Sequence, residues 1–463
     1  MESTSDAPNI MPLEVWDVLI LGGGFAGLSC AAALAEAGAK ALVAEKKSHL
    51  GGRAFSFRDP GSEDVLDNGQ HLFLGCYRET RRFLARVGAS DNLALFPKVR
   101  VAFASAPGRK DVLSCPGFLP APWHLKAGIL KFSGLSFSDK AGLSRLDAYM
   151  RRHLSDAAAP AELDRLTVRQ WLTSLGQSTQ VQTRLWDPIA LGALNDDPSV
   201  AGAPGFFQVL REAFYREAAA ARPALSNVGL SDLYAVPAAR FIESRGGRIK
   251  TLAKIAGLIE KNGRVCGART ESGETFSARA VVSTLPPWDL ARLALPSGLA
   301  DGWRHFEASP IVGINLWLDR PIMGDEPFVG MIGTDIEWAF NKSLIFKGGA
   351  KPRGHYVSLV ISGARKHLKR PPAELEAMAA RDLSACFPEF RKAKILRARV
   401  VKEPLATLSP VPGTEALRPE PGLARPGLYL AGDWTRTGLP ATIESAVVSG
   451  HRAAAEIMKG ESR

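Results

Sequence analysis

The feature that most constrains the fold is a stretch near the start of the chain, residues 18–53. It opens with an uncharged apolar run and turns through three glycines at the spacing Gly22-x-Gly24-x-x-Gly27. A helix of small residues and a second apolar run follow, and that run ends at Glu45, 21 positions after Gly24. A lone glycine motif is a weak signal, but a strand, a helix and an acidic strand end in this order predict a βαβ unit that binds a dinucleotide. The alternative is a glycine-rich turn with a purely structural role.

Each part of this motif has a physical role. Gly22 and Gly24 permit a tight turn and let the backbone approach a pyrophosphate, and Gly27 lets the helix, expected over 28–37, pack against the strand. The N-terminus of that helix then faces the phosphate charge. Glu45 stands where a carboxylate accepts hydrogen bonds from ribose hydroxyls.

Length and charge set broad limits on the function. With 463 residues the chain is too long for one compact core, so two or more domains are expected. The net charge of +11 admits nucleic acid, an anionic membrane surface or no specific partner. The basic residues are scattered and do not alternate with stacking aromatics, which argues against nucleic acid. A weak preference for anionic lipid remains.

Cysteine usage and hydropathy predict the compartment. The five cysteines are scattered and form no CxxC pair, so neither a disulfide framework nor a metal site is expected, and a reducing compartment is favoured. Residues 18–35 carry no charge, but the glycine spacing argues against a membrane span, and the acidic residues before them argue against a signal peptide. We expect a cytoplasmic protein with peripheral contact to the inner face of the cell membrane.

Later regions carry short-strand patterns. Between residues 240 and 287, turn signals that include Asn262-Gly263 separate apolar runs, which predicts a β-meander beginning with 248–250. Further expected elements are strands over 311–318, 356–361 and 427–431 and helices over 373–385 and 443–458.

Three features favour FAD over NAD as the cofactor. The Gly-Gly-Arg step at 51–53 lets the backbone approach a diphosphate and supplies a positive charge. The Gly432-Asp433 step after a strand brings a carboxylate and an N–H group to a ribityl chain and phosphate. The helix after residues 440–442 can direct its positive end at the flavin N1/C2 carbonyl region. The alternative for Asp433 is an N-cap or turn aspartate.

The predicted fold class is α/β, with a discontinuous Rossmann-like FAD-binding domain and an inserted mixed α+β substrate domain. The FAD-binding domain is expected to comprise residues 1–84, 226–299 and 416–463. The substrate domain is expected to comprise 85–225, mainly helical, and 300–415.

The chain resembles the flavin amine oxidase and phytoene desaturase superfamily over nearly its whole length. Within it, the sequence DNGQH at 67–71, followed by LGCY at 74–77, resembles the hydroxysqualene dehydroxylases, also called squalene-associated FAD-dependent desaturases. LWDP at 185–188 with ALN at 193–195 is similar to that family's middle motif, and residues 431–446 are similar to its C-terminal motif. The glycine motifs are shared by the whole superfamily, whereas DNGQH and the C-terminal motif are narrower.

The resemblance implies that hydroxysqualene is reduced to squalene, a step toward hopanoids, with reduced FAD as the hydride source. It implies FAD contacts at Gly22, Gly24, Phe25, Ala26, Glu45, Lys46, Gly52, Arg53, Gly69, Val265, Gly432, Asp433, Thr442 and Ile443. Val265 matches the position whose backbone meets the adenine. Lys46 is a departure, because related enzymes often carry another basic or a small residue there.

The expected reaction needs an apolar tunnel, one proton donor for the departing water and a rigidly held flavin. His71 is the best candidate for that donor, with orientation of the backbone near the flavin as the equal alternative. Gln70 is a candidate for a hydrogen bond to flavin or substrate, and Asp67 more simply holds a loop or a strand end. Asp187 and the pair at 196–197 are expected to serve as caps and turns.

Rival functions use the same cofactor. An isoprenoid desaturase would act with oxidised flavin, and an amine oxidase would need an aromatic cage and a catalytic lysine, neither of which the sequence identifies. A non-enzymatic FAD-binding scaffold is a more distant alternative. Only one dinucleotide fingerprint is visible, so an external reductant or reductase, or transient nicotinamide binding, is expected to supply electrons.

Residues 115–150 are expected to form a lipid entrance that rests on an anionic membrane. Apolar and aromatic residues there mix with cations, as in a helix that lies in a membrane interface. The apolar members are Phe118, Leu119, Trp123, Leu125, Ile129, Leu130, Phe132 and Phe137, beside Lys126 and Lys131. Packing within the core of the substrate domain is the alternative, because core helices share this pattern.

Overall fold

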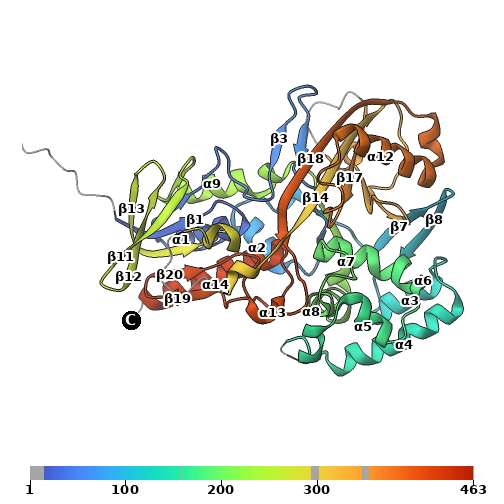
Figure 1. Ribbon diagram of the computed structural model, residues 1–463, viewed down its shortest axis with the longest axis horizontal. Coiled ribbons are helices and arrows are strands. Elements are labelled where there is room, and N and C mark those ends of the chain that lie inside the picture. The colour runs from blue at the N-terminus through green and yellow to red at the C-terminus, as the bar shows by residue number, and fades with distance from the viewer. Residues whose placement is uncertain (1–14, 157, 294–301, 347–353, 462–463) are drawn as a thin grey trace, which may run out of the picture.

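Two β-sheets organise the protein. The structure is a computed structural model, and it describes residues 15–156, 158–293, 302–346 and 354–461. Figure 1 shows the first sheet at the left, the second at the upper right and a helical layer at the lower right. In the described part of the chain, no helix is both long enough and apolar enough to cross a bilayer.

The first sheet is assembled from three distant parts of the chain. Its strand order is β10 (Arg248–Lys250), β2 (Ala41–Ala44), β1 (Val15–Leu21), β13 (Thr275–Ser283), β12 (Arg264–Thr270) and β11 (Ile255–Lys261), and β20 (Leu428–Leu430) joins β13 in parallel, with β19 (Gly422–Arg425) beyond it. The helices α1 (Phe25–Glu36) and α14 (Ile443–Glu461) pack on one face. Because β11 and β12 fold over the other face, the apolar run of β1 is buried on both sides.

The predicted βαβ unit is confirmed, although its helix begins earlier than expected. Helix α1 starts at Phe25, and the N–H of Leu28 already donates to the carbonyl of Gly24 at 2.9 Å. Gly27 therefore lies in the first helical turn. A Cβ there would lie 2.0 Å from the Gly22 oxygen, which is why the helix can pack on the strand only with glycine at this position.

The expected meander is confirmed over β11–β13, but its first strand is not part of it. Asn262 and Gly263 have φ values of 52° and 72°, as a two-residue hairpin turn requires. In contrast, β10 is parallel to β2, with Ile249 opposite Val43 at the edge of the sheet. Helix α9 (Val236–Glu243) makes the crossover that a parallel strand needs.

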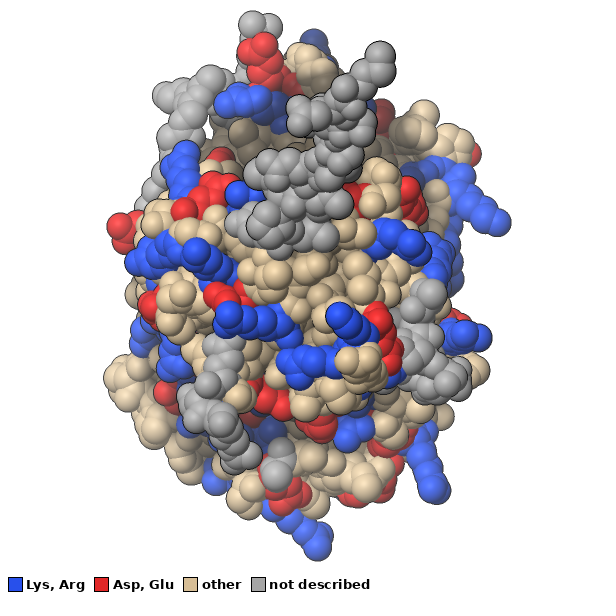
Figure 2. All heavy atoms as spheres, turned by 90° about the vertical axis from the view of Figure 1, so that its left-hand side faces the viewer, with Lys and Arg blue, Asp and Glu red and all other residues tan. Residues whose placement is uncertain are grey.

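Charged side chains on the face beyond this sheet are interspersed by sign, as Figure 2 shows. Charged side chains in and next to the strands of this sheet form ion pairs, namely Lys250–Glu274, Lys254–Glu271, Arg279–Asp17 and Arg425–Glu260. The positive charge of the chain is therefore locally compensated at these pairs.

The second sheet belongs to the inserted part of the chain. Its strand order is β18 (Ile395–Leu408), β14 (Ala308–Leu318), β17 (His355–Ile361), β16 (Trp338–Asn341), β15 (Phe328–Ile332), β7 (Arg100–Ser105) and β8 (Arg109–Ser114). Helix α12 (Pro372–Cys386) packs on one face. The strands expected at 311–318 and 356–361 and the helix at 373–385 are confirmed within these bounds.

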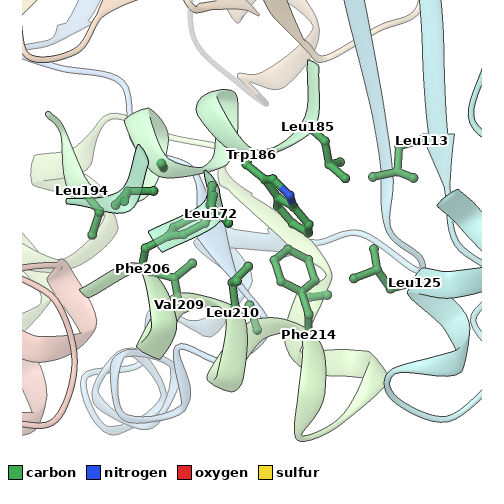
Figure 3. Close-up of a cluster of buried hydrophobic side chains, with 14 of the residues drawn as sticks. Leu113, Leu125, Leu172, Leu185, Trp186, Leu194, Phe206, Val209, Leu210 and Phe214 are labelled. Carbon is green, nitrogen blue, oxygen red and sulfur yellow. The ribbon is translucent and has the colours of Figure 1, made fainter. Parts of the chain in front are cut away.

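A helical layer covers the end of the second sheet. It contains α3 (Trp123–Lys131), α4 (Phe137–Arg152), α5 (Val168–Ser174), α6 (Thr179–Val181), α7 (Asp187–Leu194) and α8 (Ala203–Leu210). Single π-helical turns over 182–186 and 211–215 extend α6 and α8. Figure 3 shows that Trp186 and Phe214, one from each π-helical turn, face one another in the apolar cluster beside Leu113 and Leu125.

Short elements connect these layers. They are β3 (Ser56–Arg58) paired with β4 (Val65–Asp67), the small sheet of β5 (Phe73–Leu74), β9 (Pro223–Ser226) and β6 (Leu93–Leu95), and helix α2 (Arg78–Arg86). The DNGQH segment begins at the last residue of β4 and leads toward β5.

Candidate active site

One cavity of about 760 Å³ runs from the glycine loops of the first sheet into the space between the second sheet and the helical layer. Residues after β1, β2, β13 and β20 line its first end. Side chains from β7, β8, β14, β16 and β17 line its other end. A cavity of this kind, where two domains meet, is a typical position for a cofactor and its substrate.

The glycine loops form a cradle made of backbone. Gly52 has a φ of 58°, and a Cβ there would lie 3.1 Å from the Cα of Gly24. Because neither loop presents a side chain at this approach, their backbone is accessible to a phosphate group. This geometry fits the pyrophosphate of a dinucleotide.

Glu45 lines the cavity at the end of β2 and is only 4% exposed. Its carboxylate accepts hydrogen bonds from the N–H groups of Gly23 at 2.8 Å and Lys47 at 2.9 Å. These bonds orient the carboxylate beside the cradle and leave lone pairs for a ribose, because each oxygen accepts more than one bond.

Arg53 and Asp433 join the two chain segments that FAD is expected to bridge. The Arg53 guanidinium donates to the Asp433 carboxylate, which is largely buried, and both residues line the cavity. The carboxylate therefore pairs with an arginine instead of capping a helix, which was the alternative for this residue. The N–H of Gly432 is fixed by the Ser449 hydroxyl of α14 at 2.8 Å.

The N-terminus of α14 lines the same cavity through Thr442 and Ile443. The Thr442 hydroxyl accepts from the N–H of Ser445 at 3.3 Å, as a cap does. A long helix that begins at the cavity wall directs its positive end at a ligand there. The contact expected between this helix and the flavin ring stays a prediction.

Two further predicted contacts lie at the cavity beside Gly22, namely Phe25 and Ala26 at the start of α1. The Phe25 ring stacks on Tyr234, with the centroids 3.5 Å apart. The Tyr234 hydroxyl donates to the carbonyls of Gly51 and Ala54 at 2.8 and 2.9 Å, so it holds the second glycine loop. Sequence reasoning missed Tyr234, because no motif surrounds it.

Lys46 also lines the cavity, where it pairs with Asp289 of α10 (Pro287–Leu290) at 2.6 Å. Two predicted contacts do not reach the cavity. Val265 is fully buried within β12, and its N–H donates to the Pro426 carbonyl at 2.9 Å. Gly69 is buried in the loop before Gln70.

Residues 253–256 line the cavity at the end where Val265 was expected. They lie there because the N–H of Ala253 donates to the Glu45 carbonyl at 2.8 Å. The adenine contact expected at Val265 stays a prediction, and residues 253–256 are the lining residues at this end of the cavity.

A buried lysine holds the DNGQH segment. Lys342, the first residue of α11 (Lys342–Ile345), has a side chain that is 0% exposed. Its ammonium lies 2.9 Å from Asp67 Oδ2 and 2.6 Å from Gln70 Oε1, and Asp67 Oδ1 accepts from the N–H of Leu230 at 2.9 Å. The role expected for Asp67, holding a loop, agrees with these contacts. Nothing in the sequence around Lys342 marked it.

These contacts decide how Gln70 and His71 are presented to the cavity, which both of them line. Because the Gln70 carbonyl oxygen accepts from Lys342, its amide nitrogen is left as a donor, and it lies 3.2 Å from the His71 carbonyl. Burial lowers the pKa of His71 from 6.5, Asp67 opposes this shift, and the charge of Lys342 adds to it. His71 is therefore neutral at pH 7.

Two of the aspartates expected in caps and turns have different roles from each other. Asp197 does stabilise a turn, because it accepts from the N–H of Ser199 at 2.8 Å. Asp187 instead forms an ion pair with Arg169 at 3.0 Å. The cap expected at Asp187 is therefore wrong, and the residue links α7 to α5.

Asp196 was also expected in a turn, but it is a buried anchor. Its carboxylate accepts from Arg365 Nη2 at 3.0 Å and from the Ser409 hydroxyl at 2.7 Å. The preceding Asn195 lines the cavity and donates to the Thr407 hydroxyl at 2.9 Å. The ALN-Asp segment therefore joins the helical layer to the end of β18.

The far end of the cavity is apolar. Its walls are the side chains of Val99, Val101, Phe103, Leu113, Ile189, Val209, Phe214, Ile311, Trp338, Phe340 and Val360. Three of them, Leu113, Val209 and Phe214, are labelled in Figure 3. Among the described residues, no cluster of histidine, cysteine or acidic side chains could hold a metal ion.

Similar proteins are consistent with this geometry. The sequence model of the family described as flavin containing amine oxidoreductase matches residues 25–458. A hydroxysqualene dehydroxylase from Sinorhizobium fredii is 30% identical over 95% of this chain and 97% of that protein. One from Rhodopseudomonas palustris is 29% identical over 94% of this chain and 97% of that protein. The 15-cis-phytoene desaturase of Solanum lycopersicum is 25% identical over 97% of this chain and 78% of that protein.

Solved structures share the fold. A redesigned putrescine oxidase superimposes with a TM-score of 0.74 at 15% identity, covering 96% of this chain and 99% of that one. The cyclohexylamine oxidase of Brevibacterium oxydans gives 0.72 at 19% identity, covering 97% and 100%. At these identities the likeness concerns the fold alone.

Proposed function

The chain belongs to the flavin-containing amine oxidoreductase family, and from that premise we propose that it reduces hydroxysqualene to squalene with loss of water. It is an FAD-dependent oxidoreductase, as its motifs predicted. The observation that carries the proposal is the cavity, in which a dinucleotide cradle continues into a long apolar wall. Two relatives that match nearly the whole chain and carry the name hydroxysqualene dehydroxylase support this choice of substrate.

The cradle residues are proposed to hold FAD. Glu45 accepts hydrogen bonds from the ribose, and the glycine loops with Arg53 contact the pyrophosphate. Asp433 and the N-terminus of α14 contact the ribityl chain and the flavin ring. Bound reduced FAD supplies a hydride.

The apolar wall suits a hydrocarbon that ionises at one carbon. The reaction breaks the C–O bond of an allylic alcohol, and its oxygen leaves as water after gaining one proton. The neighbouring double bond delocalises the positive charge, and a hydride then forms the new C–H bond. Side chains such as Phe214, Trp338 and Phe340 exclude bulk water, which would otherwise recapture the cation.

Polar groups in the cavity wall are proposed to act at the departing hydroxyl. His71, in its imidazolium form, is the proton donor, because it lines the cavity next to the segment that Lys342 fixes. Gln70 offers its amide nitrogen as a hydrogen-bond donor to flavin or substrate. Lys342 is a positioning residue, since it contacts Asp67 and Gln70 within the protein.

A test uses the purified holoenzyme, reduced anaerobically with dithionite and mixed with hydroxysqualene in detergent. We expect squalene in the lipid extract and one equivalent of oxidised flavin for each squalene formed. Enzyme left oxidised is the matched control and should form none. Unchanged hydroxysqualene with fully reduced enzyme would exclude the proposed reaction.

A desaturase that acts on an isoprenoid is the second candidate, because phytoene desaturases match 97% of the chain at 25% identity. It would use the same cavity with oxidised flavin. Incubating the oxidised holoenzyme with phytoene separates the two candidates, since only a desaturase would add double bonds and reduce the flavin.

Electrons for the proposed reduction come from a separate reductant or reductase. The first sheet holds the only dinucleotide fingerprint in the sequence, and that fingerprint is assigned to FAD. We therefore expect this reductant or reductase to transfer electrons to FAD that stays bound to the protein.

A further inference from the structure

Four large apolar side chains protrude from the segment that contains α3 and the start of α4. Phe118 is 86% exposed, Trp123 55%, Leu130 66% and Phe137 83%. We call these four residues the outer α3–α4 face. Within the described part of the chain, every exposed phenylalanine and tryptophan belongs to this face. Exposed aromatics gathered in 20 residues of chain are a feature of interaction surfaces.

The opposite side of the same segment is core. Leu125, Ile129 and Phe132 are buried in the apolar cluster of the helical layer. Figure 3 shows Leu125 beside Leu113, and Leu113 lines the apolar end of the cavity. Helix α3 therefore separates the apolar end of the cavity from the surface. The two roles considered for this segment, core packing and a lipid-facing surface, fall on its two sides.

Charge around the face is positive. Residues 115–152 contain six lysines and arginines and two aspartates. Asp147 is already paired with Lys126 and Arg151, whereas Lys131, Arg145 and Arg152 make no ion pair with any described residue. At the first sheet, by contrast, Lys250, Lys254 and Arg425 each have an acidic partner.

Trp123 is both exposed and close to two cations. The centroid of its ring lies 4.8 Å from the Lys126 ammonium nitrogen and 5.6 Å from the Arg151 guanidinium carbon. An exposed indole suits the boundary between acyl chains and headgroups, where its ring is buried and its N–H stays near polar groups.

We propose that the outer α3–α4 face docks on an anionic phospholipid bilayer, with the apolar side chains among the acyl chains and Lys131, Arg145 and Arg152 at the headgroups. The proposal rests on the proposed function in one respect, namely that a water-insoluble substrate resides in that bilayer. Docking there brings the apolar end of the cavity next to the membrane, with α3 between them.

A second copy of this chain is the other occupant to test. Two copies joined at this face would bring the net positive charge of both segments together, which opposes association. An anionic bilayer neutralises the same charge. Charge complementarity therefore favours the bilayer.

The test measures flotation of the FAD-loaded protein with vesicles of phosphatidylglycerol and phosphatidylcholine. We expect the parent protein to float with these vesicles and to be released by salt. A variant with Phe118→Ser, Trp123→Ser, Leu130→Ser and Phe137→Ser should lose at least about tenfold in partition coefficient. A second variant, Lys131→Ser with Arg145→Ser, should lose the preference for anionic over neutral vesicles.

The matched control replaces exposed leucines elsewhere, with Leu396→Ser, Leu417→Ser and Leu423→Ser. It should float like the parent, and flavin content should be equal in all variants. Equal flotation of the parent and the fourfold variant would overturn the proposal. So would absence of parent flotation, or sedimentation that shows a parental dimer converted to monomer by the fourfold variant.

Activity measurements separate this inference from the proposed function. If both hold, the fourfold variant forms squalene from hydroxysqualene in detergent micelles but is slower than the parent when the substrate is embedded in vesicles. If the parent forms no squalene in either setting but floats as expected, the proposed function fails and the docking surface stands.

Discussion

The two ends of the cavity are built in different ways. The cofactor end consists mainly of backbone, with a few charged side chains, and most of it comes from residues 22–54 and 432–446. The apolar end consists of side chains contributed by five strands of the second sheet and by the helical layer. A backbone cradle needs particular residues at particular spacings, whereas an apolar wall needs only volume and hydrophobicity. The first is therefore visible in a sequence and the second is not.

The largest effect is expected from Lys342→Met, which alters the junction between the two ends of the cavity. This change leaves the buried carboxylate of Asp67 without its ammonium partner, which should lower the free energy of unfolding by about 3–5 kcal/mol. Urea denaturation of the holoenzyme measures it. Lys261→Met, at an exposed lysine, is the control, and adding Asp67→Asn should restore part of the loss. An unchanged midpoint in the Lys342 variant would show that the pair does not hold the junction.

Glu45→Ala should affect the cofactor end alone. Loss of charge-assisted bonds to the ribose is expected to weaken FAD binding by about 1.5–3 kcal/mol, and the freed N–H groups of Gly23 and Lys47 add to the cost. Fluorescence titration of the apoprotein with FAD gives the change. Glu45→Gln keeps one acceptor oxygen, so its affinity for FAD should lie between those of the parent and the alanine variant. Parental affinity in the alanine variant would remove Glu45 from the ribose.

Gly192→Leu should affect the apolar end alone. Gly192 in α7 lines the cavity, and a Cβ there would lie 3.4 Å from the Trp338 indole nitrogen, so a leucine occupies space meant for substrate. We expect kcat/KM for hydroxysqualene to fall at least about tenfold, or about 1.4 kcal/mol, with unchanged FAD content. Gly192→Ala is the matched control and should be tolerated. If FAD is lost as well, the two ends are not independent.

A smaller effect on kcat/KM is expected when the pH is changed. Burial holds the pKa of His71 below 6.5, so the imidazolium form, which is the competent proton donor, declines as the pH rises through this lowered pKa. Above it kcat/KM is expected to fall by about tenfold for each pH unit, and His71→Gln should remove this dependence. A flat profile in the parent between pH 5 and 8 would assign His71 to orientation of the backbone.

The smallest effect is expected from NADPH alone. With one dinucleotide cradle, assigned to FAD, the chain should show no rapid bleaching of its flavin by NADPH under anaerobic stopped flow. Addition of a flavin reductase should then restore reduction. Fast, saturable bleaching by NADPH would instead indicate transient nicotinamide binding and remove the need for a separate reductase.

The sequence was sufficient for the βαβ unit, the hairpin at Asn262-Gly263 and the Gly432-Asp433 step, because local spacing alone imposes these geometries. It could not show whether Val265 reaches the cavity, because that depends on contacts between distant segments, such as the hydrogen bond from the Ala253 N–H to the Glu45 carbonyl.

Lys342 and Tyr234 were missed for a related reason. Each acts through partners more than 150 positions away, and a lone lysine or tyrosine carries no local signature of burial. The segment 115–150 was ambiguous because its core side and its exposed side alternate along the same helix.

The assembly of the first sheet from distant segments has a consequence for synthesis. Arg53 can pair with Asp433 only after a further 380 residues have been synthesised, and β20 can join β13 only after residues 428–430 have been synthesised. At about 5–20 residues per second the ribosome needs roughly 20–80 s to cover that interval. The nascent βαβ unit therefore spends this time without the other half of its cradle. Flavin binding to the complete cradle is therefore expected only after Asp433 has been synthesised.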